Sequence, residues 1–521
     1  MAPSQRACAG ADPRQAVVAP LLRPQALEEV QRLQTGTDTM PRRVRLASTA
    51  AAPVAFAVVV GGAGAAGPSR SFSVTGPDPG TGSGTTREYL LPDLRQNAYL
   101  DLFESLARDF GTRVPRSRQP SDVPGFKAPY QALLTENLSP NVLYGYGDPG
   151  VIRVAEEGAC GEKACYYLVA TSNDAPNSFP IVRSRDLKEW RLVGFVFPAG
   201  RKPRWAADGE GVSDYWAPEM HRVGGEYLVC FAAREKDRTL AIGTARSPRP
   251  GGPFVAADEP LLRGGVIDPH IFVDGAGTAF LFWKEDTNDL WPGRLSELLC
   301  ERGDLIAGLF PSVEGRRTAS LIQALWPWAR SLEPMERFFV QQILVEAVTS
   351  DFAAFQERLK AAEGRTDAAA RTAIGAVLRA MRTPVYAQRL APDGLSLLGE
   401  RTLVLENDRE WEAHLVEGMW VAGHEGRYYM FYSGNDFSTA WYGVGVAVAD
   451  SPLGPYRKTD EPLLRSTADW SGPGHPSVAA GPGGEPRLFL HAYFPGRAGY
   501  KEFRALLAVP IAFRADSVVL R

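Results

Sequence analysis

The feature that most constrains the fold of this chain is an internal repeat. Residues 252–262 read GPFVAADEPLL and residues 454–464 read GPYRKTDEPLL, and the segments before them, IGTARSPRPG and VGVAVADSPLG, also align. A strand–turn–strand cassette that returns later in the same chain is typical of a repeat architecture. The sequence therefore predicts several similar β units.

Short runs of aromatic and β-branched residues recur through the same region. They are separated by turn residues and read CYYLVATS, GEYLVCFAA, TAFLFWKE, RYYMFYSG and PRLFLHAYF. Each run follows a segment that starts at residue 148, 216, 268, 417 or 475. Without an insert in the third interval, these starts define five units of about 55 residues, each long enough for four strands. We therefore expect an all-β fold, a five-bladed β-propeller over residues 141–521.

A helical pattern interrupts the third unit between residues 287 and 382. Apolar residues recur there at spacings of three or four, as in Val340, Leu344, Val348, Phe352, Phe355 and Leu359, and again in Ile374, Leu378 and Met381. We expect an α-helical insertion in blade three, between the strands TAFLFWKE and PVYAQRL. The simplest role for its apolar stripe is packing onto the rim of the propeller.

The N-terminal region has a different composition. From Met40, three arginines precede the apolar residues 50–60, and Ala63-Gly64-Ala65 then matches a signal-peptide cleavage site. Translation that starts at Met40 would place this signal first, and the protein would be secreted or periplasmic, without membrane association after cleavage. The predicted plan is an upstream segment with a signal peptide over 1–66, a flexible linker over 67–87 and a partly helical N-terminal extension over 88–140.

Charge and cysteines narrow the partners. The formal net charge of −3 indicates no basic surface for nucleic acid, and we expect no such partner. Cys160 and Cys165 bracket a short turn between two apolar runs, and in an exported protein they could form a local disulfide. Half of a zinc site is the alternative, but the chain has no second cysteine pair at metal-ligand spacing.

Three of the five units open their inner strand with an acid, namely Asp148, Asp268 and Glu417. The inner strands of a propeller begin near its axis at one face, so equivalent positions converge in one funnel. A single such acid could be only a turn residue, but three in the same phase indicate a site. Glycoside hydrolysis uses such a set, because one carboxyl must donate a proton while another activates water or attacks the anomeric carbon. A third negative charge helps to keep the acid protonated.

Six segments, in this order, resemble those of glycoside hydrolase family 43: DPGVIRV, YYLVATSNDAPNSFPIVRSRDLKEW, YWAPEM, VIDPHIFVDGAGTAFLFWKED, LVEGMWV and GPGHPSV. The resemblance runs from Asp148 to the C-terminus, apart from the insertion. It implies that Asp148 is the general base, that Asp268 positions the acid and tunes its pKa, and that Glu417 is the general acid of an inverting mechanism. It also implies that His475 helps to hold a metal ion, often calcium, in the central channel, although the chemistry requires no cofactor.

Two further residues are candidates for substrate contact. Trp216 opens blade two at the axis and could stack on a sugar face, or it could serve packing alone. His475 is a candidate for substrate or metal binding, and a hydrogen-bonded core role is the alternative. The other histidines show no spacing that indicates a metal cluster; they are His221, His270, His414, His424 and His491.

These observations predict a secreted glycosidase that acts on oligosaccharides or polysaccharides containing arabinose or xylose. The alternatives are a fructosidase or glycoside phosphorylase on a related propeller, or a propeller that binds glycans without catalysis. The fructosidase pattern Trp-Asn-Asp-Pro is absent near the first acid, and the presence of all three carboxylates counts against a non-catalytic protein.

The direction of the strands also predicts a place for the insertion. The strand that starts at Asp268 runs away from the carboxylates and TAFLFWKE runs back, so the insertion should stand beside the mouth of the funnel. We expect Trp291, Trp326 or Trp328 to form a wall there that faces the substrate and favours exo-action. The alternative is an insertion that only enlarges the core or makes a subunit contact.

Overall fold

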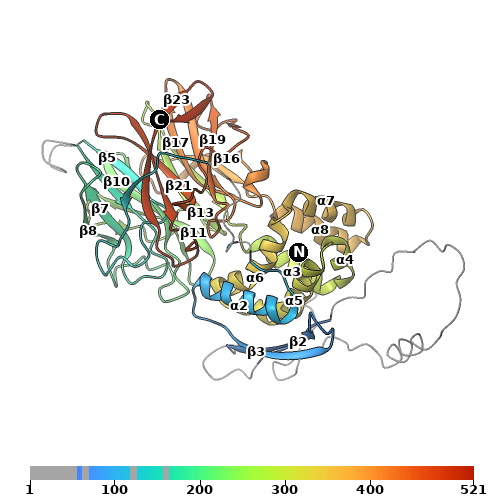
Figure 1. The fold of residues 1–521 in the computed structure, drawn as a ribbon. Coiled ribbons are helices and arrows are strands. Elements are labelled where there is room, and N and C mark those ends of the chain that lie inside the picture. The colour runs from blue at the N-terminus through green and yellow to red at the C-terminus, as the bar shows by residue number, and fades with distance from the viewer. Residues whose placement is uncertain (1–54, 61–69, 116, 118–125, 156–163) are drawn as a thin grey trace, which may run out of the picture.

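The computed structural model describes residues 55–60, 70–115, 117, 126–155 and 164–521 (Figure 1). Within this part of the chain, five antiparallel sheets follow one another in sequence. Their strands are β5 (Gly150–Val154), β6 (Cys165–Val169), β7 (Ser178–Ser184) and β8 (Trp190–Phe197); β9 (Trp216–Val223), β10 (Glu226–Arg234), β11 (Leu240–Ser247) and β12 (Val255–Ala256); β13 (Val266–Val273), β14 (Ala279–Glu285), β15 (Val385–Leu390) and β16 (Leu397–Leu405); β17 (Val416–His424), β18 (Arg427–Gly434), β19 (Gly443–Ala449) and β20 (Arg457–Lys458); and β21 (Ser471–Ala480), β22 (Pro486–Tyr493), β23 (Ala505–Arg514) and β24 (Ser517–Leu520), with β4 (Gln131–Leu134) beside β23.

The first strands of these sheets form a closed ring. β5 contacts β9, β9 contacts β13, β13 contacts β17, β17 contacts β21, and β21 returns to β5. Each sheet therefore packs between two neighbours, and strands such as β6 and β10 are buried along nearly their whole length. Burial on both faces explains why these strands appear in the sequence as continuous apolar runs rather than as strict alternation.

Side-chain hydroxyls at the second strand of one sheet bind the first strand of the next sheet. The backbone N–H of Ala217 donates to Thr171 Oγ1 at 2.8 Å, and the N–H of His475 donates to Ser433 Oγ at 2.7 Å. These bonds give partners to buried backbone groups that the strand ladders leave free. They also hold the beginnings of the first strands, at which the predicted site residues lie, in fixed positions.

Helices lie between β14 and β15, in the segment where the apolar periodicity indicated an insertion. They are α3 (Leu290–Glu301), the 3-10 turn η2 (Gly303–Leu305), α4 (Ile306–Leu309), α5 (Val313–Ala329), α6 (Pro334–Thr349), α7 (Phe352–Glu363) and α8 (Ala368–Ala380), and a further 3-10 turn, η3 (Glu410–Glu412), precedes β17. In the part of the chain that is described, no single helix is long and apolar enough to cross a membrane. α6 and α7 have sufficient length and apolar character only when taken together, and the two helices are bent by 90° relative to each other.

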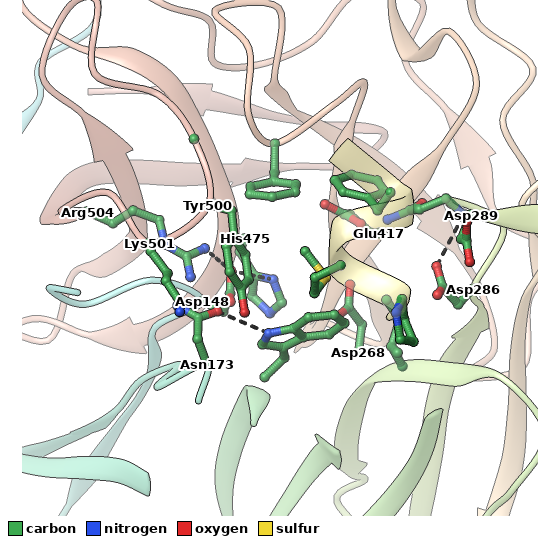
Figure 2. Close-up of a pocket in the computed structure, with 18 of the residues that line it drawn as sticks. Asp148, Asn173, Asp268, Asp286, Asp289, Glu417, His475, Tyr500, Lys501 and Arg504 are labelled. Carbon is green, nitrogen blue, oxygen red and sulfur yellow. Dashed lines mark hydrogen bonds and ion pairs between the residues drawn. The ribbon is translucent and has the colours of Figure 1, made fainter. Parts of the chain in front are cut away.

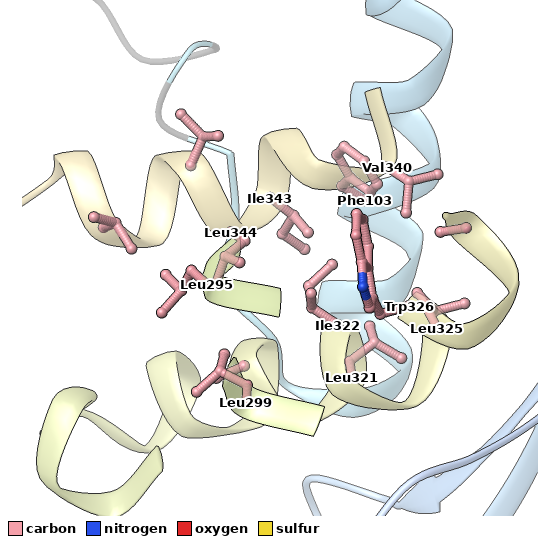
Figure 3. Packing of buried hydrophobic residues seen from close by; sticks show 14 of the residues in the cluster. Phe103, Leu295, Leu299, Leu321, Ile322, Leu325, Trp326, Val340, Ile343 and Leu344 are labelled. Atoms are coloured by element: carbon pink, nitrogen blue, oxygen red, sulfur yellow. The ribbon is translucent and has the colours of Figure 1, made fainter. Parts of the chain in front are cut away.

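The N-terminal elements pack against these helices. They are β1 (Ala57–Val60), β2 (Ser71–Pro77), β3 (Gly84–Leu90) and α2 (Gln96–Phe110). Phe103 of α2 lies in the same hydrophobic core as Trp326 of α5 and Val340 of α6 (Figure 3). We call β1–β3, α2 and α3–α8 together the helical unit, which stands on one side of the sheets (Figure 1).

The predicted flexible linker over residues 67–87 is wrong where the structure describes it. β2 and β3 pair in register from Ser71 opposite Leu90 to Pro77 opposite Gly84. Phe72 and Val74 alternate with exposed residues and point into the core of the helical unit. The two-residue period of a strand was present in this segment, but its Gly, Ser and Thr content suggested a linker. Residues 67–69 lie outside the described residues.

Part of the predicted signal peptide is also a strand. β1 pairs with β2, and Phe56 and Val58 are buried in the core of the helical unit. Cleavage at Ala63–Ala65 would remove this strand, so its packing counts against cleavage at that point. Residues 1–54 and 61–69, which carry the rest of the prediction, lie outside the described residues.

Cys165 takes part in a disulfide bond. Its predicted partner, Cys160, falls in residues 156–163, outside the described residues. Cys230 is a buried free thiol. The disulfide prediction is therefore supported for Cys165, while the identity of its partner stays a prediction.

Candidate active site

A pocket lies on the axis of the ring, where the first strands begin. All five residues predicted for the site line it: Asp148, Trp216, Asp268, Glu417 and His475. Figure 2 shows Asp148, His475 and Arg504 on one side of the pocket, Glu417, Asp286 and Asp289 on the other, and Asp268 between them. The convergence of equivalent positions, expected from the sequence, therefore occurs.

The backbone is irregular at the same place in each of the five first strands. The φ angles of Asp148, Ala217, Asp268, Gly418 and His475 are 52°, 46°, 55°, 59° and 51°. Residues with a side chain rarely adopt this left-handed conformation, which costs on the order of 1–3 kcal/mol each. The strand pairing is interrupted at the same points, between Ile267 and His270 and between Glu417 and Trp420. Asp268 and Glu417 therefore lie where the regular hydrogen-bond ladder of their strands is interrupted.

Gly418 follows Glu417 and has a special role in this arrangement. A Cβ atom at this position would lie 2.9 Å from His475 Nδ1. Because the ring is in the way and φ is positive, only glycine fits here without displacing His475. The Glu-Gly pair therefore allows Glu417 and His475 to approach each other across two sheets.

Asp148 is held in its ionised form. Its Oδ1 atom lies 2.8 Å from Arg504 Nη1, and Oδ2 accepts a hydrogen bond from Thr171 Oγ1 at 2.5 Å. Burial opposes ionisation, but Arg504, His475, His491 and the Thr171 hydroxyl outweigh it and lower the pKa of Asp148. Since burial lowers the pKa of both histidines, Arg504 is the main cation beside Asp148 at neutral pH.

The pKa values of Asp268 and Glu417 are raised. Burial raises the pKa of Asp268 to about 6, the charge of Lys284 opposes this rise, and the charge of Asp148 adds to it. Burial also raises the pKa of Glu417, and the charge of Asp268 adds to the rise. The pocket therefore contains one strongly acidic carboxyl and two weakly acidic ones, which is the separation that acid–base catalysis needs.

Lys284 and Tyr442 bind the two oxygens of Glu417. Lys284 Nζ lies 3.0 Å from Oε2, and the hydroxyl of Tyr442 donates to Oε1 at 2.9 Å. Both contacts favour a negative charge on Glu417 and partly offset the effect of burial. These two partners can therefore stabilise the carboxylate that remains after Glu417 gives up a proton.

A second cluster lies beside Asp268. Glu219, His221 and His270 bring their ligand atoms within 4.8 Å of one another, as in a metal site. The N–H of Val421, however, donates to His270 Nε2 at 2.9 Å, so the proton of the neutral ring is on Nδ1, which lies 2.7 Å from Glu219 Oε2. A protonated ring nitrogen cannot bind a metal. The cluster is therefore a hydrogen-bonded contact between sheets.

The surroundings of His475 give little support to the predicted calcium ion. His475 Nδ1 lies 3.4 Å from Asp148 Oδ1, and this oxygen is already paired with Arg504. Calcium prefers six to eight oxygen ligands, and within the described chain His475 belongs to no group of three metal-capable side chains. A calcium ion at His475 stays a prediction.

The predicted tryptophan wall is wrong in its residues. Trp291 and Trp326 are buried in the core of the helical unit, and Trp328 packs against it; none of the three lines the pocket. The insertion does reach the pocket, but through Pro334, Met335 and Phe338 of α6. Large apolar side chains of a helical segment are usually buried in its core, and these tryptophans lie in or against that core rather than at the pocket.

The family model for glycosyl hydrolases family 43 matches residues 139–301 and 376–519. The chain belongs to this family. The gap in the match falls on the helical segment between β14 and β15, so family 43 accounts for the sheets and the pocket floor but not for most of the helical unit.

Individual members of family 43 resemble parts of the chain. Xylosidase/arabinosidase 43A of Humicola insolens is 32% identical over 128 residues, which are 25% of this chain and 37% of that protein. Probable arabinan endo-1,5-alpha-L-arabinosidase A of Aspergillus flavus is 26% identical over 164 residues, 28% of this chain and 48% of that protein. Both relatives are therefore matched over less than two thirds of their length. A crystal structure of a thermostable family-43 glycoside hydrolase has a TM-score of 0.49 and 23% identity, covering 74% of this chain and 96% of that chain.

Sequence reasoning missed several residues of this family 43 site. Lys284 is the first charged residue after the apolar run AFLFW, and it pairs in the ladder with Ile267, the neighbour of Asp268. Glu219 and His221 are two apart on one strand and therefore share a face. These signals were available. The sequence gives no such signal for Arg504 or Thr171, because neither residue opens a first strand.

Proposed function

We propose that this protein is a glycosidase that hydrolyses O-glycosidic bonds of glycans containing arabinose or xylose. The observation that carries the proposal is that carboxyl groups from three different sheets line one pocket and that their pKa values are shifted in opposite directions. Asp148 is kept ionised beside Arg504, whereas burial raises the pKa of Glu417. This is the division of roles that glycoside hydrolysis requires.

Glu417 is the general acid in this proposal, and Asp148 is the general base. Glu417 gives its proton to the leaving oxygen as the glycosidic bond breaks, and Lys284 and Tyr442 then stabilise the carboxylate. Asp148 takes a proton from the water that attacks the anomeric carbon, so the product has inverted configuration. Asp268 lies between them, and its Oδ2 accepts the N–H of Gly418, next to the acid, at 2.8 Å.

The proposal includes the fold and the substrate. The ring of first strands supports the interpretation of the five sheets as blades of a five-bladed β-propeller. The pentose substrates rest on membership in family 43 and on relatives whose names include xylosidase, arabinosidase and arabinan endo-1,5-alpha-L-arabinosidase.

Two variants test the catalytic roles. Glu417→Ala should lose activity on natural oligosaccharides by roughly 100-fold or more but keep much of it on aryl glycosides with a good leaving group, which needs no proton. Asp148→Ala should lose activity on both, since no group activates water. Proton NMR of the first product should show the inverted anomer. Full activity of Glu417→Ala on an oligosaccharide would overturn the assignment.

Export to the periplasm or the medium is also a proposal. The disulfide of Cys165 supports an oxidising compartment, whereas β1 lies in the segment that signal cleavage would remove. N-terminal sequencing of the protein recovered from culture medium would decide: a first residue after Ala65 supports cleavage, and a chain that keeps residues 57–60 excludes it.

A further inference from the structure

We infer that the pocket accepts one neutral terminal sugar of a chain or branch, and that α6 of the helical unit is the wall that excludes internal chain segments. This inference rests on the glycosidase function proposed above. Family 43 does not supply it, because the matched regions leave out residues 302–375, which include α6.

The first turn of α6 faces the catalytic carboxylates. Pro334, Met335 and Phe338 line the same pocket as Asp148, Asp268 and Glu417. Residues 334 and 338 are four apart, so they lie on one face of the helix. Arg337 in the same turn binds Asp289 at the start of α3, with Nη2 and Oδ2 2.5 Å apart. This ion pair fixes the beginning of α6 at the pocket.

The neighbouring walls are fixed by α2 of the helical unit. The buried side chain of Gln96 accepts the N–H of Tyr500 at 3.0 Å and donates to Ser438 Oγ at 2.6 Å. Tyr500 lines the pocket, as does Phe437, the neighbour of Ser438. The Tyr500 ring also contacts Phe339 of α6, with centroids 5.5 Å apart. One glutamine therefore ties two pocket loops, from different sheets, to the helical unit.

The carboxylates are nearly enclosed as a result. The exposed fractions of Asp148, Asp268 and Glu417 are 9%, 7% and 7%. A polymer cleaved internally must extend in both directions from the scissile bond, so the catalytic groups of an endo-acting enzyme lie in an open cleft. We therefore place the sugar that ends the chain in this enclosed pocket, with the remainder of the substrate outside its mouth.

The charges of the pocket select against acidic sugars. Among the described residues that line it, the cations are Arg234, Lys501 and Arg504. Arg234 is paired with Asp214 at 2.5 Å, Lys501 with Asp174 at 2.6 Å, and Arg504 with Asp148 at 2.8 Å. Because each cation already has a carboxylate partner, none is left to bind the carboxylate of a uronic acid. The terminal sugar is therefore neutral.

The wild-type protein provides the first test. The aryl pentoside that is cleaved fastest, arabinofuranoside or xylopyranoside, selects the matching linear oligosaccharides, which are labelled at the reducing end. We expect free pentose and a ladder that shortens by one unit at a time, and no cleavage of aryl glucuronides. Early release of di- or trisaccharides would overturn the inference. Absence of activity on every aryl pentoside would instead overturn the proposed function.

A matched pair of variants tests the role of α6. Met335→Ala with Phe338→Ala opens the wall and should raise the disaccharide fraction among the first products by roughly tenfold, because a second sugar can now enter. Leu359→Ala removes a fully buried side chain of α7 from the same core without touching the pocket. It should lower stability and leave the products unchanged. Unchanged products from the double variant, or an increased disaccharide fraction in both this variant and Leu359→Ala, would overturn the role of α6. If the double variant fails to fold, the product ladder of the wild type still tests the inference.

Discussion

The carboxyl group of Asp268 binds its proton more tightly in the folded protein than in the unfolded chain. Burial is the main cause, and the pKa rises from 3.8 to about 6. A group with a raised folded-state pKa stabilises the protein fully below its unfolded pKa and loses that contribution as the pH rises through the folded value. Stability should therefore decrease between about pH 4 and pH 6.

Replacement of Asp268 by Asn should remove this decrease. A shift of about two pH units corresponds to about 3 kcal/mol, so Asp268→Asn should unfold at higher denaturant than the wild type at pH 7, and the difference should nearly vanish at pH 4. Activity should fall, because the residue that positions Glu417 has lost its charge. Urea titrations at both pH values measure the first effect; a variant less stable than wild type at pH 7 would contradict it.

We expect Lys284 to set the alkaline limit of activity. It lowers the pKa of both Glu417 and Asp268, and the proposed mechanism requires protonated Glu417. Lys284→Met should therefore move the alkaline limb of kcat/KM upward by about one pH unit or more, with a lower kcat because the carboxylate product of Glu417 is less stable. Lys458→Met breaks a similar buried pair with Glu412, at 2.7 Å, outside the pocket. Lys458→Met should lower stability and leave the pH profile unchanged. If the alkaline limb of kcat/KM shifts in neither variant, Lys284 does not set it.

The three catalytic candidates could be predicted because each occupies the same position in its repeat unit. Each opens a first strand, and the repeat shows which residues open first strands. The partners Arg504, Thr171 and Tyr442 were not predictable, because they come from other parts of their sheets and only folding brings them to the carboxylates. Charge states depend on these partners, so the sequence indicated the set of acids but not their individual protonation.

At the scale of elements, α2 positions two loops of the pocket through Gln96. Gln96→Met keeps the size of the side chain and removes both hydrogen bonds. We expect KM for an aryl pentoside to rise about three- to tenfold, in line with the loss of about 1 kcal/mol for a hydrogen bond, with a smaller change in kcat. Gln323→Met is the control, since Gln323 bonds Leu299 O within the helical unit and lies away from the pocket. Equal KM values in both variants would show that α2 does not position the site.

The elements differed in how well their sequences indicated them. The strands of the sheets were predicted because burial on both faces makes them continuous apolar runs between turn residues. β2 was missed because its alternating Phe72 and Val74 stand among Ser, Thr and Gly. The wall was assigned to tryptophans because the sequence showed which segment is helical, but the side of each helix that faces the pocket is decided by packing between helices.

At the scale of the whole molecule, the helical unit depends on two distant segments. Tyr99, Phe103, Leu106 and Phe110 of α2 are buried in one core with the helices of the insertion, in which Tyr99 contacts Phe339 of α6. Replacement of residues 288–381 by a short Gly/Ser linker should therefore expose this face, lower the melting temperature and promote aggregation, measured by calorimetry and size-exclusion chromatography. Removal of residues 1–115 as well should restore solubility. A single replacement that stays monomeric with an unchanged melting temperature would show that the two segments are independent.

The same division of the helical unit has a consequence for biosynthesis. α2 ends at Phe110 and α5 begins at Val313, so about 200 residues are translated between them. At about 5–20 residues per second this takes roughly 10–40 s. During this time the first two sheets emerge, and α2 has Phe56 and Tyr89 beside Phe110 but lacks the helices of the insertion. The first helix of the described chain is synthesised early but can be fully buried only after the third sheet has begun to form, and a ribosome-bound chaperone would have that interval in which to bind it.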